Sequence, residues 1–192
     1  MRISRQRYIV YSQLSLLLGL LVCIFIKPKG LSANAGISYY GTFLRTVFPY
    51  TVGILGGSYY CYRFTQTLHN KSLAFLRNSM IAISILSIGI VITPYSINSI
   101  LDWAHTTFGT IIFVLELILS AWIIIKTKFN SNMLMLWIIE LICGIAAAIY
   151  TLPHQGFLIQ SQILFQLTFG IILYLSFNEH KKVFSKQLVQ PD

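Results

Sequence analysis

Six long stretches of the chain are almost continuously apolar, and short polar segments separate them. They cover residues about 8–26, 43–66, 72–94, 101–126, 131–152 and 156–177. An α-helix needs roughly 20 mostly apolar residues to cross a bilayer, so each stretch is long enough. Lipid offers backbone groups no water, so a spanning segment must satisfy its own hydrogen bonds as a helix. The pattern predicts an all-α polytopic membrane bundle of six transmembrane helices, with residues 1–192 forming a single integral membrane domain.

The composition agrees with a membrane protein. Of the 192 residues, 56% are hydrophobic and 10% are charged, and the mean hydropathy is +0.72. Soluble domains carry about 25% charged residues. Little of the chain is left between the six stretches for a separate soluble domain.

The formal net charge of +9 would suit a protein that binds nucleic acid. The positions of the basic residues indicate membrane topology instead. If the N-terminus is cytoplasmic, the outer side receives only Lys27, Lys29 and Arg45. The inner side then receives Arg2, Arg5, Arg7, Arg63, Lys71, Arg77, Lys126, Lys128, Lys181, Lys182 and Lys186. This is the positive-inside pattern, and the inner basic residues suit contact with anionic headgroups. We therefore expect both termini in the cytoplasm, a bacterial cytoplasmic (inner) membrane location, membrane lipids as partners and no nucleic acid.

The first apolar stretch has a second reading as a signal peptide. A basic start at residues 1–7 precedes it, and the small residues "ANA" at 33–35 resemble a cleavage site. The intervening segment is long and carries Lys27 and Lys29, which favours a retained first helix.

Two carboxylates fall inside the apolar stretches. Glu116 lies 10 residues before Lys126, and Glu140 lies nine residues after Ser131. At 1.5 Å per residue, both lie roughly 13–15 Å from the inner boundary, near the middle of the bilayer. Acids within a membrane are costly, so they usually face a bundle interior or a cavity. We expect the two to face each other from neighbouring antiparallel helices.

Glutamines supply amide groups at a similar depth. Gln155, Gln162 and Gln166 differ by seven and four residues and so share one helix face, whereas Gln160 lies off it. The sequence therefore predicts an intramembrane polar cluster, and the residues assigned to it are Glu116, Glu140, Gln162, Gln166 and Ser120. Three roles stay open for it, namely a structural tie between helices, a pocket for a ligand or ion, and catalysis.

A second group of polar residues is expected at the outer surface, namely Asp102, His105, His154 and Arg45. Asp102 is expected to cap the helix that it opens. Two histidines and one aspartate are possible zinc ligands, but no HxxxH or HExxH spacing is present, so we predict no metal site. No cofactor fingerprint is found either. The cysteines Cys23, Cys61 and Cys143 lie within apolar stretches without a CxxC pair, and packing roles are expected.

The longest connection follows the first apolar stretch. Its Gly, Ser and Asn content favours turns, and Tyr39 and Tyr40 suit an interfacial aromatic belt. Together with the six-helix layout, "GISYYG" at 36–41 and "DWAHTTFG" at 102–109 give the chain a loose resemblance to DRAM-like and related uncharacterised bacterial six-helix membrane families. The resemblance is one of layout, and it implies no catalytic residue.

These observations leave three hypotheses. The first is a membrane protein whose intramembrane pocket binds or passes a small polar or lipid-like ligand, with a homodimer plausible if it transports. The second is an outer-face membrane enzyme that uses Asp102, His105 and His154. The third is a structural or assembly partner without a ligand. The absence of a recognised catalytic pattern favours a non-enzymatic role.

Overall fold

The structure is a computed structural model, and it describes residues 5–32, 36–95, 97–127, 131–150 and 157–179. Within these residues every regular element is a helix, so the chain is all-α as predicted. The α-helices are α1 (Arg5–Ile26), α2 (Leu44–Thr65), α3 (Ala74–Ile92), α4 (Ser99–Lys126), α5 (Ser131–Tyr150) and α6 (Leu158–Glu179). Their ends lie within a few residues of the six apolar stretches.

Five of the helical segments are long and apolar enough to cross a membrane. They are Arg5–Ile26, Lys71–Ile92, Ser99–Lys126, Ser131–Ile149 and Leu158–Phe177. The helix α2 is equally long, at 22 residues, but it is not among these five. It carries more polar and small residues than the others, including Thr46, Gly53, Gly57 and Ser58.

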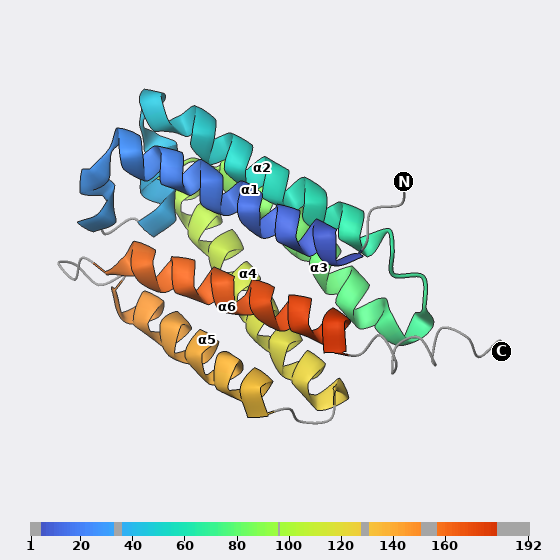
Figure 1. Cartoon of the computed structure of the whole chain (residues 1–192). Helices are drawn as coiled ribbons and strands as arrows, with labels where there is room; N and C mark the ends of the chain where they lie inside the picture. Colours follow the sequence, from blue (N-terminus) through green and yellow to red (C-terminus); the bar gives the residue numbers. More distant parts are fainter. Residues whose placement is uncertain (1–4, 33–35, 96, 128–130, 151–156, 180–192) are drawn as a thin grey trace.

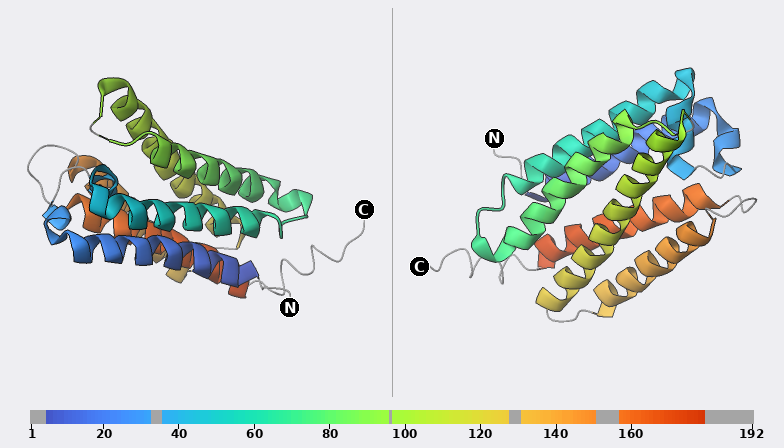
Figure 2. Two further views of the ribbon diagram at one scale, coloured as in Figure 1. Left: turned by 90° about the horizontal axis from the view of Figure 1, so that it is seen from above. Right: turned by 180° about the vertical axis from the view of Figure 1, so that it is seen from behind.

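The helices run side by side and alternate in direction along the chain (Figure 1). The start of α1 and the ends of α2 and α6 lie at one end of the bundle (Figures 1 and 2). The opposite end carries two 3-10 helices, η1 (Pro28–Ser32) and η2 (Gly36–Thr42). We call η1 and η2 the cap, and the end of the bundle that they form the cap end.

Glycines bring α1 and α2 into close contact. A Cβ atom on Gly19 would lie 2.7 Å from Gly53 Cα and 2.7 Å from the Pro49 carbonyl oxygen, so only glycine fits. The Ser12 hydroxyl donates to the Gly57 carbonyl at 2.8 Å across the same interface. Small residues and interhelical hydrogen bonds of this kind drive helix association in membranes.

The cap differs from the expected turn-rich loop. Seven consecutive residues of η2 are helical, and its Tyr40 is fully buried instead of lying in an aromatic belt. The ring of Tyr40 lies over Gly30, where a Cβ atom would come within 2.5 Å of it. The Thr46 hydroxyl donates to the Tyr40 carbonyl at 2.7 Å and ties the cap to α2. The aromatic belt prediction for Tyr40 is therefore wrong, because glycine at position 30 opens a place for the ring.

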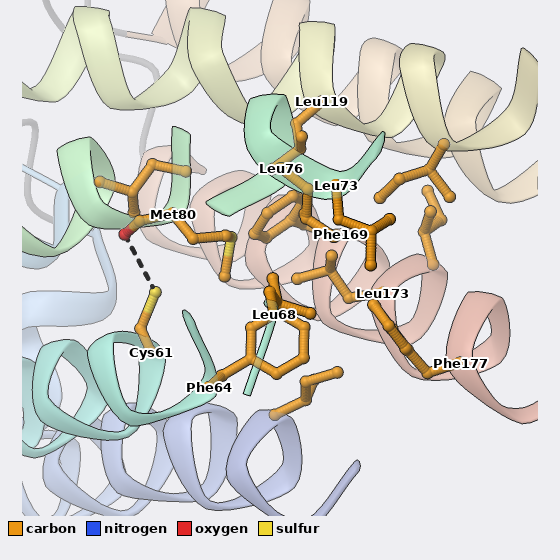
Figure 3. Close-up of a cluster of buried hydrophobic side chains, with 14 of the residues drawn as sticks. Cys61, Phe64, Leu68, Leu73, Leu76, Met80, Leu119, Phe169, Leu173 and Phe177 are labelled. Atoms are coloured by element: carbon orange, nitrogen blue, oxygen red, sulfur yellow. Dashed lines mark hydrogen bonds between the residues drawn. The ribbon is translucent and has the colours of Figure 1, made fainter. Parts of the chain in front are cut away.

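An apolar core fills the bundle near the turn between α2 and α3. Figure 3 shows Phe64 of α2, Leu68 and Leu73 of the connection between α2 and α3, and Phe169 of α6 pointing toward one another, with further side chains from α3 and α4. In the same region the Cys61 thiol donates to the Met80 carbonyl at 3.4 Å (Figure 3). All three cysteines of the chain are buried and free. This core fills the end of the bundle opposite the cap.

Candidate functional site

A cavity of about 660 Å³ lies among the six α-helices and extends up to η2. Its size falls in the roughly 300–1,000 Å³ range of small-molecule sites. Most of the lining is apolar, with Ile9, Leu16, Ile54 and Ile83 among the contributors. Polar groups from five helices, α1, α2, α3, α4 and α6, interrupt that lining, and they define the site.

The strongest polar contact at the cavity joins α4 and α6. The Gln166 amide Nε2 donates to Glu116 Oε2 at 2.6 Å, and both residues line the cavity. Glu116 is only 2% exposed, so the Gln166 amide supplies a hydrogen bond that water does not. The bond places the two side chains at the same depth, as the sequence analysis expected. Because Glu116 lies on the cavity wall, its carboxyl group can form a hydrogen bond with a ligand in the cavity.

The second acid lies behind this wall. Glu140 of α5 is fully buried, and its carboxyl group interacts electrostatically with that of Glu116. Both Glu140 oxygens and the Ser120 hydroxyl oxygen are buried without a hydrogen-bond partner among the described residues. Neither Glu140 nor Ser120 lines the cavity. Of the five residues assigned to the polar cluster, Glu116, Gln162 and Gln166 therefore meet at the cavity, and the other two do not.

Gln162 and Gln160 hold the cap in place. The Gln162 Oε1 atom accepts from the Ile37 backbone N–H at 2.8 Å, and the Gln160 amide donates to the Leu31 carbonyl at 3.1 Å. Next to this bond Gly36 has a φ of 61°, the left-handed region that favours glycine. A Cβ atom there would also collide with the Gln162 side chain. The cap therefore closes over the cavity through two glutamines of α6, while Gln155 lies outside the described residues.

His105 forms the third connection to the cap. It is 7% exposed, and it lines the cavity instead of standing on the outer surface. Its Nδ1 lies 2.6 Å from the Thr93 carbonyl oxygen, which can only accept, so Nδ1 carries the proton. The Nε2 of a neutral ring then accepts from the Ser38 hydroxyl of η2, at 2.5 Å. Both ring nitrogens are thus occupied, which explains why the ring holds the end of α3 and the cap together.

Of the other residues assigned to the outer surface, neither Asp102 nor Arg45 lines the cavity with His105. Asn98, not Asp102, is the N-cap of α4, since its side chain accepts from the Leu101 N–H at 2.8 Å. Asp102 lies in the first turn of that helix. Arg45 is exposed on α2 and does not line the cavity, and His154 lies outside the described residues. In the described part of the chain no group of three His, Cys, Asp or Glu side chains can hold a metal ion.

Several polar residues of the cavity were not predicted. Gln13 of α1 lines it, packs against Gly170 of α6 and keeps a buried Oε1 atom that has no hydrogen-bond partner among the described residues. Serines on α1, α2 and α3 also line it, namely Ser12, Ser58, Ser84 and Ser87. A glutamine midway along an apolar helix was the available signal for Gln13. The serines carry no such signal, because serine is ordinary in membrane helices.

Comparison of the chain with protein-family models, with curated proteins and with solved structures finds no match.

Proposed function

We propose that this protein is an integral membrane protein whose intramembrane cavity binds or passes a small polar or lipid-like ligand. The observation that carries the proposal is the cavity of about 660 Å³ with the hydrogen-bonded pair of Glu116 and Gln166 on its wall. An acid inside a membrane marks a functional site by default, because its burial is costly. A purely structural tie needs no adjoining space of this size.

We also propose that α2 is a sixth membrane span. Its length equals that of α1, and it lies beside α1 along the whole bundle (Figures 1 and 2). Several of its small and polar residues, such as Thr46 and Ser58, are buried, whereas Leu44, Phe48 and Val52 are exposed. A helix with an apolar exterior and a polar interior suits lipid on one side and protein on the other. Its low average hydropathy then reflects residues that never meet lipid.

Six spans and the distribution of basic residues support cytoplasmic termini. Among the described residues, Lys27, Lys29 and Arg45 lie at the cap end. The opposite end carries Arg5, Arg7, Arg63, Lys71, Arg77 and Lys126. The excess of basic residues marks the cytoplasmic side, so the cap faces outward. We place the protein in a bacterial cytoplasmic membrane, with membrane lipids around it and with a homodimer as an arrangement suited to transport.

The outer-face enzyme hypothesis receives less support. Its candidate His105 has both ring nitrogens engaged with Thr93 and Ser38, so neither nitrogen is available for proton transfer or metal binding without breaking a bond. An assembly partner without a ligand leaves the cavity unexplained. The pocket hypothesis accounts for the cavity and for the buried acid together.

The test is to identify small molecules and lipids that co-purify with the protein. The informative variant is Glu116→Gln, in which an amide oxygen can still accept from Gln166 while the carboxylate is lost from the cavity wall. Glu140→Gln is the matched control, since it changes a buried acid that does not line the cavity. We expect at least one compound to co-purify with the wild type and with Glu140→Gln, and to be depleted from purified Glu116→Gln. An identical set of compounds from all three proteins would contradict the proposal.

A further inference from the structure

The cavity reaches the lipid-facing surface between α4 and α5. Its lining includes Thr106, Thr110 and Val114 of α4 and Ala148 of α5, and all four side chains are exposed. The two helices lie close near the α4–α5 connection and diverge toward the cap end, as the two views that show them both indicate (Figures 1 and 2). The opening therefore faces the bilayer and lies in its outer half in the proposed topology. We call these four residues the rim.

Small residues keep this opening wide near the cap end. A Cβ atom on Gly109 would meet nothing within 4 Å, so space lies directly over that position. Below it the opening is closed by Phe113, which fits over Gly144 of α5, where a Cβ atom would collide with the ring. Phe113 also stacks on Phe165 of α6, with ring centroids 4.7 Å apart. The stacked rings close the seam between α4 and α5 below Gly109, and both rings line the same cavity as Glu116.

The serines and Glu116 on the cavity wall offer hydrogen-bond acceptors, while the side-chain amides of Gln13 and Gln162 also offer N–H donors. Each cavity serine on α1, α2 and α3 donates its proton to a backbone carbonyl, which leaves oxygen lone pairs for the cavity; these serines are Ser12, Ser58, Ser84 and Ser87. Gln13 Oε1 is a buried acceptor to which no group in the described part of the chain donates. Glu116 adds a carboxyl group. Among the described residues that line the cavity there is no Lys or Arg. A ligand head made only of acceptors, such as a carboxylate, would find no cation there and many opposing lone pairs.

We propose that the ligand is a single-chain amphiphile whose head donates hydrogen bonds, an alcohol or an amine, and that it enters from the outer leaflet between α4 and α5. This inference rests on the proposed function and specifies the ligand class and the route. The apolar lining takes the chain, and the acceptors of α1, α4 and the serines take the head. The opening over Gly109 admits the molecule without passage through the cap, which Gln162 and His105 hold shut.

The test uses three photoreactive probes of one chain length, namely hexadecanol, hexadecylamine and hexadecanoic acid, each with a diazirine in the chain. The protein is reconstituted in phosphatidylcholine nanodiscs and irradiated, and the labelled residues are mapped by mass spectrometry. We expect the alcohol, the amine or both to label the cavity lining, and the acid to label only lipid-exposed positions. Labelling by the alcohol alone or the amine alone identifies which of the two heads the site takes.

The variant Gly109→Trp tests the route. The open space at Gly109 gives the indole room without displacing the bundle, and Ile118→Trp is the control, since Ile118 is exposed on the same helix but does not line the cavity. Cavity labelling is expected to fall on the order of tenfold in Gly109→Trp, equivalent to about 1.4 kcal/mol, and to stay at the wild-type level in the control.

Equal labelling of the cavity by the acid would overturn the head assignment, and labelling unchanged by Gly109→Trp would overturn the route. If no probe labels the cavity, the ligand class is wrong. The proposed function itself would still stand if a different compound co-purifies in a manner that depends on Glu116.

Discussion

The hydrogen bond between Gln166 and Glu116 is expected to stabilise the fold measurably, and Gln166→Leu removes it. The N–O distance is 2.6 Å, short for a hydrogen bond of this type, and Glu116 is 2% exposed. Leaving a buried polar group without its partner costs about 1–3 kcal/mol. We expect Gln166→Leu to lower the free energy of unfolding by an amount in this range.

A double-mutant cycle with Glu116→Leu isolates the contribution of the pair. When both partners become apolar groups of similar shape, no polar group is left without a partner, so the double variant should lose less than the two single variants together. Interhelical hydrogen bonds in membranes average about 0.6 kcal/mol and reach about 1.7 kcal/mol. A short, buried bond to a carboxyl group belongs in the upper part of this range, so we expect a coupling energy of about 1 kcal/mol or more.

Reversible unfolding in mixed micelles, followed by tryptophan fluorescence, provides the measurement. Thr168→Val replaces Gln166→Leu in a control cycle, since the Thr168 hydroxyl donates to carbonyls of its own helix. The control coupling should stay within about 0.5 kcal/mol of zero. A coupling for Glu116 and Gln166 no larger than that of the control would refute the importance assigned to this bond.

Three further outcomes are expected. In Gly19→Ala the new Cβ would lie 2.7 Å from backbone atoms of α2, so overpacking should lower the free energy of unfolding by about 1–3 kcal/mol. Gly109→Ala should cost less, because a Cβ atom at Gly109 meets nothing within 4 Å. Equal losses in the two variants would contradict the close contact between α1 and α2. Burial raises the pKa of Tyr40 from 10.0 to about 12, so between these pH values the unfolded chain releases a proton that the folded chain keeps. The stability advantage of Tyr40→Phe over the wild type should therefore grow by up to 1.36 kcal/mol per pH unit in this window, and a difference in unfolding free energy that is constant with pH would count against the burial of the phenol. A reporter fused after Asp192 should give a cytoplasmic signal, whereas a signal from the outer side would contradict the proposed topology.

The six helices could be predicted from the sequence because a membrane-spanning helix depends on local apolarity and length. Their ends were predicted to within a few residues, and α2 was included because the apolar stretch at 43–66 is long enough to span a bilayer. The acids were predicted to face inward because burial in lipid is costly for them, and Gln162 and Gln166 because they share one helix face.

The remaining features depend on packing between distant segments. The burial of Tyr40 requires Gly30 beneath its ring, and no local pattern links the two. Asn98 caps α4 because the helix begins three residues before Asp102, and such boundaries are difficult to predict. Gln13 joins the cavity because α1 packs against α6 at Gly170. The opening of the cavity follows the divergence of α4 and α5, and the periodicity of apolar residues does not predict the angle between two helices.

The central claim is that the cavity beside Glu116 is a ligand site, and a crystal structure of the protein grown from bicelles tests it most directly. The account predicts elongated density in the cavity with a polar atom within hydrogen-bond distance, about 3.2 Å, of Glu116, Gln166 or Gln13. A structure in which α4 and α5 close against each other and side chains fill the space beside Glu116 would contradict it.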